Sequence, residues 1–279
     1  MNKIKRTRAD AAFDALNIAL LAILTVILLY PLYFVLIASV SDPYAIAQGS
    51  VKLIPVRPTL EAYQNIMKDT RIWLGYRNTI IYTVLGTLLS LALTIPSAYV
   101  LSKKDLPGRA ILMTFCLITM YFGGGLIPTY LIVKKVGLLN RAYTLIVLGS
   151  VSVYNIIVTR SFFQSTLPDS LFESARIDGA GEMKQLQYIT MPAVWLQLTF
   201  MVVSIFYQSL GGNFGLVNVI LPSAALDENG MVMGLYVYRY GTSLYKVGFS
   251  YAASIVMLIV TSIISLTVKF LMDKAGEKL

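Results

Sequence analysis

The sequence predicts an all-α polytopic membrane protein, on the basis of its composition and the length of its apolar stretches. Of 279 residues, 57% are hydrophobic and only 13% are charged, whereas a soluble domain carries about a quarter charged residues. The mean hydropathy is +0.70. Six apolar stretches approach or exceed the roughly 20 residues that a helix needs to cross a bilayer. Runs of this length argue against the core helices of a soluble protein.

The expected order is a basic tail over residues 1–12, a transmembrane domain over residues 13–272 and a short tail over residues 273–279. The predicted spans are residues 13–40, 79–101, 110–133, 142–159, 192–210 and 249–271. An even number of spans places both termini on one side. Thirteen of the 23 Lys and Arg residues then share that side, which favours cytoplasmic termini because basic residues are retained there. The basic stretch 134–141 argues against this orientation.

The third expected span contains the stretch YFGGGLIPTY, which ends at Tyr130. Three glycines and Pro128 predict a break or kink in the helix. A membrane tolerates such a break where neighbouring helices or a water-lined cavity satisfy the freed backbone groups. The stretch is therefore either an element that lines a pathway or moves, or a place where small residues let helices pack closely.

Two long connections are expected outside the membrane, over residues 41–78 and 211–248. The first contains IPVRPTLEAYQNIM, which predicts an extended segment followed by a short helix, and the second contains a turn at DENG. The net charge of +9 is spread over many loops, so it indicates topology and lipid headgroups rather than nucleic acid as a partner.

The sequence lacks the residue types that several kinds of chemistry require. The interiors of the six expected spans hold no Asp, Glu, Lys or Arg, which argues against an ion-driven secondary transporter and an intramembrane hydrolase. The chain has no histidine, and its one cysteine, Cys116, lies in an apolar run where it is expected to pack. No Walker A pattern and no Gly-Lys pair occur. We therefore expect a non-catalytic chain without metal or cofactor. If the chain performs work, the energy must come from another subunit.

A compact charged segment interrupts the apolar chain at residues 168–191. Pro168 should end the preceding helix, and Ser170 with Glu173 forms a capping box for a short helix over residues 171–178. Gly179 is placed to end that helix. A second helix is expected to run from about residue 181 to residue 192. The segment is thus predicted to be a helical elbow at the membrane surface, where it either docks on a partner or lies on lipid as an amphipathic helix.

The elbow resembles the coupling motif of ABC-importer permease subunits, E-A-A-x3-G-x9-I-x-L-P. The chain has Glu173-Ser174-Ala175, then Gly179, then the run from Ile189 to Pro192, with every spacing kept. Ser174 and Met191 stand where the pattern has the first Ala and the Leu. The stretches YPLYFVLIASVSDP, SAYVLSKKDLPGRA and GGGLIPTYLIVKKVGLLN resemble the maltose-importer-like permeases that take up oligosaccharides or polysaccharide fragments.

This resemblance implies a type I ABC importer permease fold, in the bacterial cytoplasmic membrane, in which the elbow is a coupling helix. The implied partners are a second permease, two cytoplasmic ATPase subunits that bind ATP and Mg, an extracytoplasmic solute-binding protein, a carbohydrate substrate and membrane lipid. The implied ATPase-coupling residues are Glu173, Ser174, Ala175, Arg176, Asp178, Gly179, Ala180 and Gly181.

Sugar sites use aromatic faces and neutral hydrogen-bonding groups, which makes polar residues in or beside the spans candidates for the substrate pathway. They are Tyr82, Tyr121, Tyr130, Asn155, Gln197, Tyr207, Gln208 and Asn213. For each one the alternative is an interfacial anchor or a hydrogen bond between helices. The same machinery with a non-sugar solute, and a non-transport membrane assembly or anchoring protein that docks through the elbow, are the rival functions.

Overall fold

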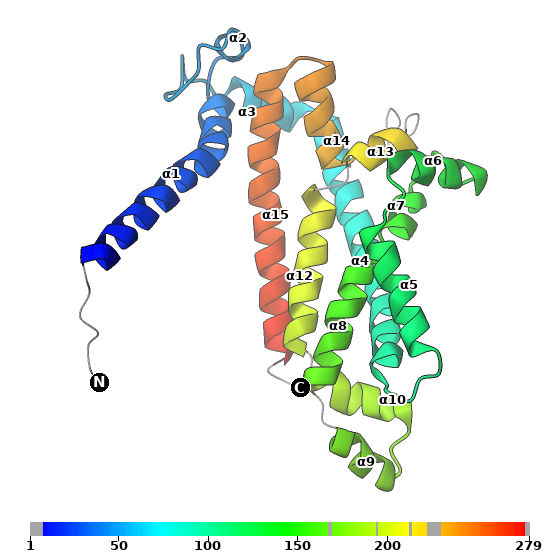
Figure 1. Ribbon diagram of the computed structural model, residues 1–279. Coiled ribbons are helices and arrows are strands. Elements are labelled where there is room, and N and C mark those ends of the chain that lie inside the picture. The colour runs from blue at the N-terminus through cyan, green and yellow to red at the C-terminus, as the bar shows by residue number, and fades with distance from the viewer. Residues whose placement is uncertain (1–7, 167–168, 194, 212–213, 222–229, 277–279) are drawn as a thin grey trace. The chain divides into compact units, whose positions relative to one another are not determined.

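The computed structural model describes residues 8–166, 169–193, 195–211, 214–221 and 230–276, and all regular elements in these ranges are helical (Figure 1). The prediction of an all-α protein is confirmed. In this part of the chain, three helices are long and apolar enough to cross a membrane: α1 (Arg8–Ser39), α4 (Thr70–Ser102) and α15 (Val247–Gly276). A bent pair of helices is a fourth candidate. The count of six spans stays a prediction.

The chain divides into two units, and each is described by itself. The first unit comprises Met1–Lys68 and Arg239–Val256, and the second comprises Asp69–Tyr238 and Met257–Leu279. The long helix α15 contributes its first part to the first unit and its second part to the second.

The first unit is built around the C-terminal end of α1. After this helix come α2 (Pro43–Ala47) and α3 (Glu61–Lys68), and the start of α15 also belongs to the unit. Its core is a small apolar cluster that includes Ile37, Ala45 and Ile46. The ring of Phe34 packs edge-on against Tyr251, with 5.8 Å between ring centroids. The rest of α1 makes few contacts within the chain, as a helix that faces lipid should.

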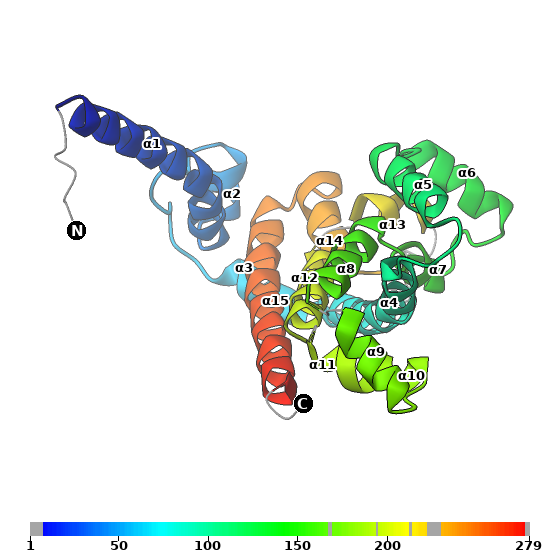
Figure 2. The same cartoon turned by 60° about the horizontal axis from the view of Figure 1, so that its bottom comes forward.

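The second unit is a bundle in which α4 packs against α8 (Val153–Thr166) and α12 (Trp195–Gly211) (Figure 2). Its largest apolar cluster unites these three helices through Tyr99, Phe163 and Leu198. A second cluster joins α6 (Leu126–Lys135), α13 (Phe214–Ile220) and α14 (Met233–Tyr238). Figure 1 places α13 and α14 at the end of this unit opposite to α9 and α10.

A row of small polar residues is buried along α4. The row begins with the adjacent Asn78 and Thr79. From Thr79 it recurs every three or four positions, which is the spacing of one helix face, at Thr83, Thr87, Ser90 and Thr94. Small side chains of this kind let helix backbones approach closely in a membrane, where apolar burial alone does not drive association. The first residue of the row also bonds to the segment just before α14, because Asn78 Nδ2 donates to the Met231 carbonyl at 3.1 Å.

The third apolar stretch is broken at its glycines, as the sequence predicts. Helix α5 (Arg109–Tyr121) ends before the glycines, and α6 begins after them at an angle of 113° to α5. Gly125 has a φ of +81°, which an L side chain adopts only with strain. Pro128 does not cause the break, since it occupies the first turn of α6, where its missing N–H has no helical acceptor.

The fourth apolar stretch is not the single helix expected over residues 142–159. Instead α7 (Tyr143–Leu148) stops at Gly149, and α8 starts at Val153 and continues to Thr166. Ser152 begins α8 by accepting a hydrogen bond on its Oγ from the Asn155 N–H at 3.3 Å, which is the geometry of an N-cap.

The connections also differ in part from the expectation. An extended stretch followed by the short helix α3 is present as predicted, but α4 starts at Thr70 rather than near residue 79. Asp69 explains this early start, because its carboxylate accepts from the Arg71 N–H at 2.9 Å and caps the helix. The DENG turn, except Gly230, lies outside the described residues.

Candidate functional site: the helical elbow

The charged segment forms the elbow that the sequence predicts, and its first arm is α9 (Asp169–Ile177). Two backbone bonds close this arm: the Ala180 N–H donates to the Ala175 carbonyl at 2.8 Å, and the Gly179 N–H donates to the Arg176 carbonyl at 3.0 Å. Gly179 lies in the left-handed region with a φ of +77°. Together these features make a Schellman turn, the arrangement that a glycine after a helix favours. The turn thus fixes the direction of the chain after α9.

The predicted capping box can be followed only in part. The Pro168 position and the Ser170 side chain lie outside the described residues. The Glu173 side chain is described and is exposed.

The second arm runs from the turn directly into the membrane bundle. It consists of α10 (Glu182–Gln185), the π-helical turn η1 (Leu186–Thr190) and α11 (Met191–Ala193), followed by α12. Proline has no N–H, and its ring crowds the carbonyl one turn earlier. The wider turn just before Pro192 is a known way to absorb such a disturbance. The described part of the arm is therefore helical from Glu182 to Ala193, and α12 begins at Trp195.

Gln185 connects the two arms and was not predicted from the sequence. Its side chain is only 1% exposed, and Nε2 donates to the Ala180 carbonyl in the turn at 2.7 Å. The Thr190 hydroxyl in turn donates to the Gln185 carbonyl at 3.2 Å. These bonds join the turn, α10 and η1 into one piece. The signal in the sequence is weak, because a glutamine inside a short polar helix is ordinarily a solvent-exposed residue.

Most of the side chains predicted to contact a partner are exposed on the surface of the elbow. Glu173, Ser174, Arg176 and Asp178 are exposed. The glycines Gly179 and Gly181 are exposed as well, whereas Ala175 and Ala180 are half-buried in the turn.

Large apolar side chains are also open on the elbow. Ile177 is 86% exposed, Met183 73% and Tyr188 70%. Residues 169–193 contain four acidic and two basic residues, so the elbow is net negative. A membrane-lying amphipathic helix is typically rich in Lys and Arg instead. Open apolar side chains with net negative charge favour a protein partner with a basic surface over anionic lipid.

The two glycines of the elbow have different structural requirements. Gly179 needs its left-handed φ. Gly181 has an ordinary φ of −64° and ψ of 163°. A Cβ added at Gly181 would meet no atom within 4 Å. The fold itself therefore explains Gly179 but not Gly181.

The predicted substrate-pathway residues come from separate elements. Tyr82 is half-buried on α4, Tyr130 half-buried on α6 and Asn155 half-buried on α8, while Tyr121 is 75% exposed at the end of α5. Their role stays a prediction. The remaining candidates cannot be placed, because the described side chains do not include Gln197, Tyr207 and Gln208, and Asn213 lies outside the described residues.

The chain is similar to known transport proteins over most of its length. Protein LplC of Bacillus subtilis is 34% identical over 192 residues, which are 69% of this chain and 65% of that protein. The polygalacturonan/rhamnogalacturonan transport system permease protein YtcP of the same species is 36% identical over 180 residues, or 64% and 63% of the two chains. The matched part thus spans less than two thirds of either relative.

A solved structure is similar over nearly the whole chain. It is a chain of a bacterial ABC transporter involved in the import of the acidic polysaccharide alginate, with a TM-score of 0.79 and 28% identity, and the match covers 96% of this chain and 99% of that one. The fold of an ABC-importer permease, expected from the coupling motif, is confirmed by this likeness. Residues 72–276, which include the elbow, match the family model of the binding-protein-dependent transport system inner membrane component. The chain belongs to that family.

Proposed function

We propose that this chain is one permease subunit of an ATP-driven importer for carbohydrate, and that its elbow is the coupling helix. It forms half of the translocation pathway, and a second permease forms the other half. Two cytoplasmic ATPase subunits bind ATP and Mg, and an extracytoplasmic binding protein delivers the solute. Both termini lie in the cytoplasm.

The observation that carries this proposal is the construction of the elbow. Its first arm presents exposed charged and apolar side chains, and its second arm continues into α12 of the bundle. Gln185 and the Schellman turn hold the two arms together. A force applied to α9 can therefore reach a bundle helix through a short path, because a single residue separates α11 from α12 in the sequence.

The coupling step follows from this continuity. The ATPases close when they bind ATP, and this displaces the docked α9. Because the elbow is one piece, α10 and α12 are displaced with it, and the bundle changes between its inward-facing and outward-facing arrangements. Rigid-body motion of this type needs a ligand that binds two states unequally, and ATP on the partner chain is that ligand.

An oligosaccharide is the substrate class that the relatives and the spans favour together. YtcP is named for a transport system of polygalacturonan and rhamnogalacturonan, and the similar solved transporter is involved in importing alginate. The interiors of the predicted spans contain no charged side chain but many hydroxyls, and the row along α4 shows that some of these hydroxyls lie inside the bundle. Hydroxyl and amide groups suit the neutral hydrogen bonds of sugars.

Reconstitution of the complete complex in lipid vesicles tests the proposal. ATP hydrolysis and uptake of a labelled sugar are measured with the binding protein either empty or loaded with oligosaccharides. Hydrolysis that rises several-fold only with the sugar-loaded protein, together with uptake, is the expected result. Stimulation by a non-sugar solute alone would overturn the carbohydrate assignment. Uptake by this chain alone, driven by an ion gradient, would overturn the importer assignment.

A matched pair of variants tests the elbow in the same vesicles. Gly179→Ala forces an L side chain into the left-handed region, at a cost of about 1 to 2 kcal/mol. Gly181→Ala imposes no such strain. Uptake should therefore fall in the first variant even where the isolated chain remains folded. The second variant lowers uptake only if an ATPase surface lies against residue 181.

A further inference from the structure

The first unit presents a short loop with open apolar side chains, residues 51–57, with the sequence VKLIPVR. Leu53 is 64% exposed and Ile54 is 71% exposed, whereas the neighbouring Val51 is buried in the core of the unit. If the backbone of the loop is fixed, these two large aliphatic side chains cannot turn inward, and their exposure requires an explanation.

The beginning of this loop is held by two tyrosines of α1. The Tyr30 hydroxyl donates to the Lys52 carbonyl at 3.2 Å, and the Tyr33 hydroxyl donates to the Leu53 carbonyl at 2.5 Å. Both acceptors are main-chain atoms, so the bonds fix the backbone and leave the side chains of residues 52 and 53 directed elsewhere.

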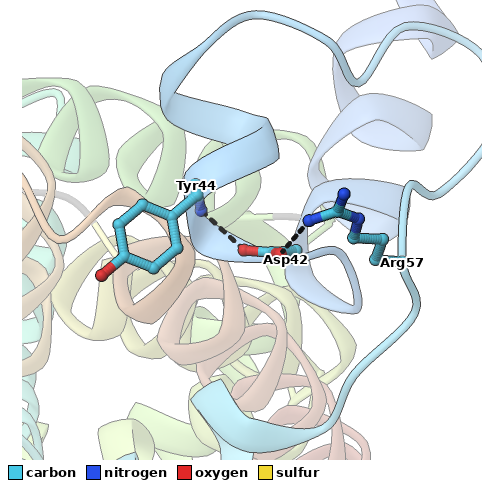
Figure 3. A network of polar contacts seen from close by, with 3 residues as sticks. All are labelled: Asp42, Tyr44 and Arg57. Carbon is cyan, nitrogen blue, oxygen red and sulfur yellow. Dashed lines mark hydrogen bonds and ion pairs between the residues drawn. The ribbon is translucent and has the colours of Figure 1, made fainter.

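The end of the loop is held by the segment after α1. The Asp42 N–H donates to the Val56 carbonyl at 3.1 Å, and the Val56 N–H donates to the Ser41 hydroxyl at 3.2 Å. Figure 3 shows the Asp42 carboxylate accepting from the Tyr44 N–H at 2.8 Å while it pairs with Arg57 at 3.8 Å. Leu53 and Ile54 therefore lie between two fixed points.

The position of the two tyrosines along α1 gives the depth of the loop in a bilayer. Asp14 is the last charged residue before the uncharged part of α1. With a rise of about 1.5 Å per residue, Tyr30 lies about 24 Å and Tyr33 about 28 Å farther along the helix. The hydrocarbon core is about 30 Å thick, so both tyrosines lie at its far boundary, where amphipathic rings are favoured.

The charges of the loop suit the same location. Loop 51–57 contains Lys52 and Arg57 and no acidic residue. Both basic side chains are exposed, and Arg57 is 84% exposed in spite of its pairing with Asp42. Basic residues beside apolar ones are the combination that binds anionic headgroups while aliphatic side chains enter the acyl boundary.

We propose that loop 51–57 is a membrane-surface anchor, in which Leu53 and Ile54 insert at the boundary between headgroups and acyl chains. Lys52 and Arg57 bind lipid phosphates beside them. Tyr30 and Tyr33 set the depth of the loop, because each holds one of its carbonyls. The anchor fixes the end of α1 at one surface of the membrane.

Spin labelling at single cysteines tests this proposal in the assembled complex. Cys116 is the one cysteine of the chain, so Cys116→Ser gives a background without label. Leu53→Cys and Ile54→Cys are labelled separately, and Gln48→Cys, exposed at the end of α2, is the matched control. The complex is placed in vesicles of phosphatidylethanolamine and phosphatidylglycerol, and collisions of each label with oxygen and with a water-soluble nickel chelate are measured.

The proposal expects oxygen to exceed the nickel chelate at positions 53 and 54 and the reverse at position 48. Nickel in excess at all three positions would place the loop in water and overturn the proposal. A label at 53 and 54 that neither reagent reaches would show that protein covers the loop and would overturn it as well. Two labelled positions are used, so that one poorly folded variant does not decide the result.

A second variant tests the depth-setting role of the tyrosines. Tyr30→Phe with Tyr33→Phe keeps both rings and removes both hydroxyls. The label at position 53 should become more mobile in its spectrum, and its oxygen-to-nickel ratio should shift toward the value at position 48. An unchanged spectrum and ratio would contradict the role given to these hydroxyls.

Discussion

The elbow and loop 51–57 both hold large apolar side chains out of their own unit, but they differ in the charges around them. The elbow exposes Ile177 and Met183 among mostly acidic residues, whereas the loop exposes Leu53 and Ile54 beside Lys52 and Arg57, of which Arg57 also pairs with Asp42. Anionic lipid attracts the second combination and repels the first. The sign of the neighbouring charge thus separates an apolar surface meant for protein from one meant for lipid.

The two regions also differ in how they are held. Main-chain bonds of the Schellman turn and the Gln185 side chain keep the elbow together from within. Loop 51–57 is held from outside, by tyrosine hydroxyls of α1. A region that is held from within can move as a unit when a partner displaces it, while the loop can move only with α1.

The largest expected effect comes from breaking the turn of the elbow with Gly179→Pro. Proline cannot adopt the φ of +77°, and it removes the N–H that donates to the Arg176 carbonyl. A cost of about 3 kcal/mol corresponds to about a 100-fold loss of docking. Co-purification of the ATPase with the tagged chain, quantified by mass spectrometry, measures the effect.

Gly49→Pro is the matched control for this experiment, since Gly49 also has a positive φ, of +68°, and a donating N–H but lies outside the elbow. The amount of tagged chain in the membrane should be the same for both variants. If the Gly179→Pro variant still bound the ATPase fully, the turn would not be part of the docking surface.

A negative charge placed in each region in turn tests whether one surface contacts protein and the other contacts lipid. Ile177→Asp puts a carboxylate into the proposed protein interface and should weaken ATPase binding by about tenfold or more, the loss caused by a residue at the centre of an interface. Leu53→Asp should leave ATPase binding unchanged. Both are measured by co-purification as above, and equal losses in the two variants would contradict the division between a protein surface and a lipid surface.

A smaller effect is expected when the link between the two arms is weakened. Gln185→Met keeps the length of the side chain but removes the donor to the Ala180 carbonyl, at a cost of about 1 kcal/mol. ATP hydrolysis without solute should persist, while its stimulation by the loaded binding protein falls. Gln187→Met is the control, because Gln187 is exposed on the next turn. An undiminished stimulation in Gln185→Met would show that the link does not transmit motion.

The smallest effect is expected from reversing one charge of the loop. Lys52→Glu should weaken the attraction to anionic lipid by about 1 kcal/mol or somewhat more, and the label at position 54 should become more accessible to the nickel chelate. The shift should disappear in vesicles without phosphatidylglycerol. A shift of the same size in neutral vesicles would show that Lys52 acts through the fold instead.

The elbow could be predicted from the sequence because its determinants are local. Gly179 ends a helix through its own backbone freedom, but the second arm does not stop at Pro192 as expected, because Pro192 lies within α11. The glycine break before α6 was predictable for the same reason. The residues that contact a substrate or an ATPase depend on chains other than this one, and their roles stay predictions.

Features whose residue types do not reveal their burial or their hydrogen bonds were missed, even where the contacts are local. Gln185 is polar and lies in a short charged helix, so its burial follows from the fold of the turn above it. The start of α4 at Thr70 depends on the Asp69 cap. The residues around Asp69 are polar, so the sequence did not distinguish this cap from an ordinary loop residue. The polar row on α4 has a visible period of three to four residues, yet apolar residues of the same helix conceal which face packs inward.

Photocrosslinking from the elbow shows whether α9 lies against an ATPase or against lipid. In the Cys116→Ser background, a benzophenone probe is attached to Ile177→Cys or, for comparison, to Leu53→Cys, in membranes that contain the native complex. Illumination should join position 177 to a subunit that carries a Walker A motif and position 53 to lipid, as identified by mass spectrometry. If position 177 yields lipid adducts and no ATPase adduct, the elbow lies on the membrane surface, and the account of it as a coupling helix is contradicted.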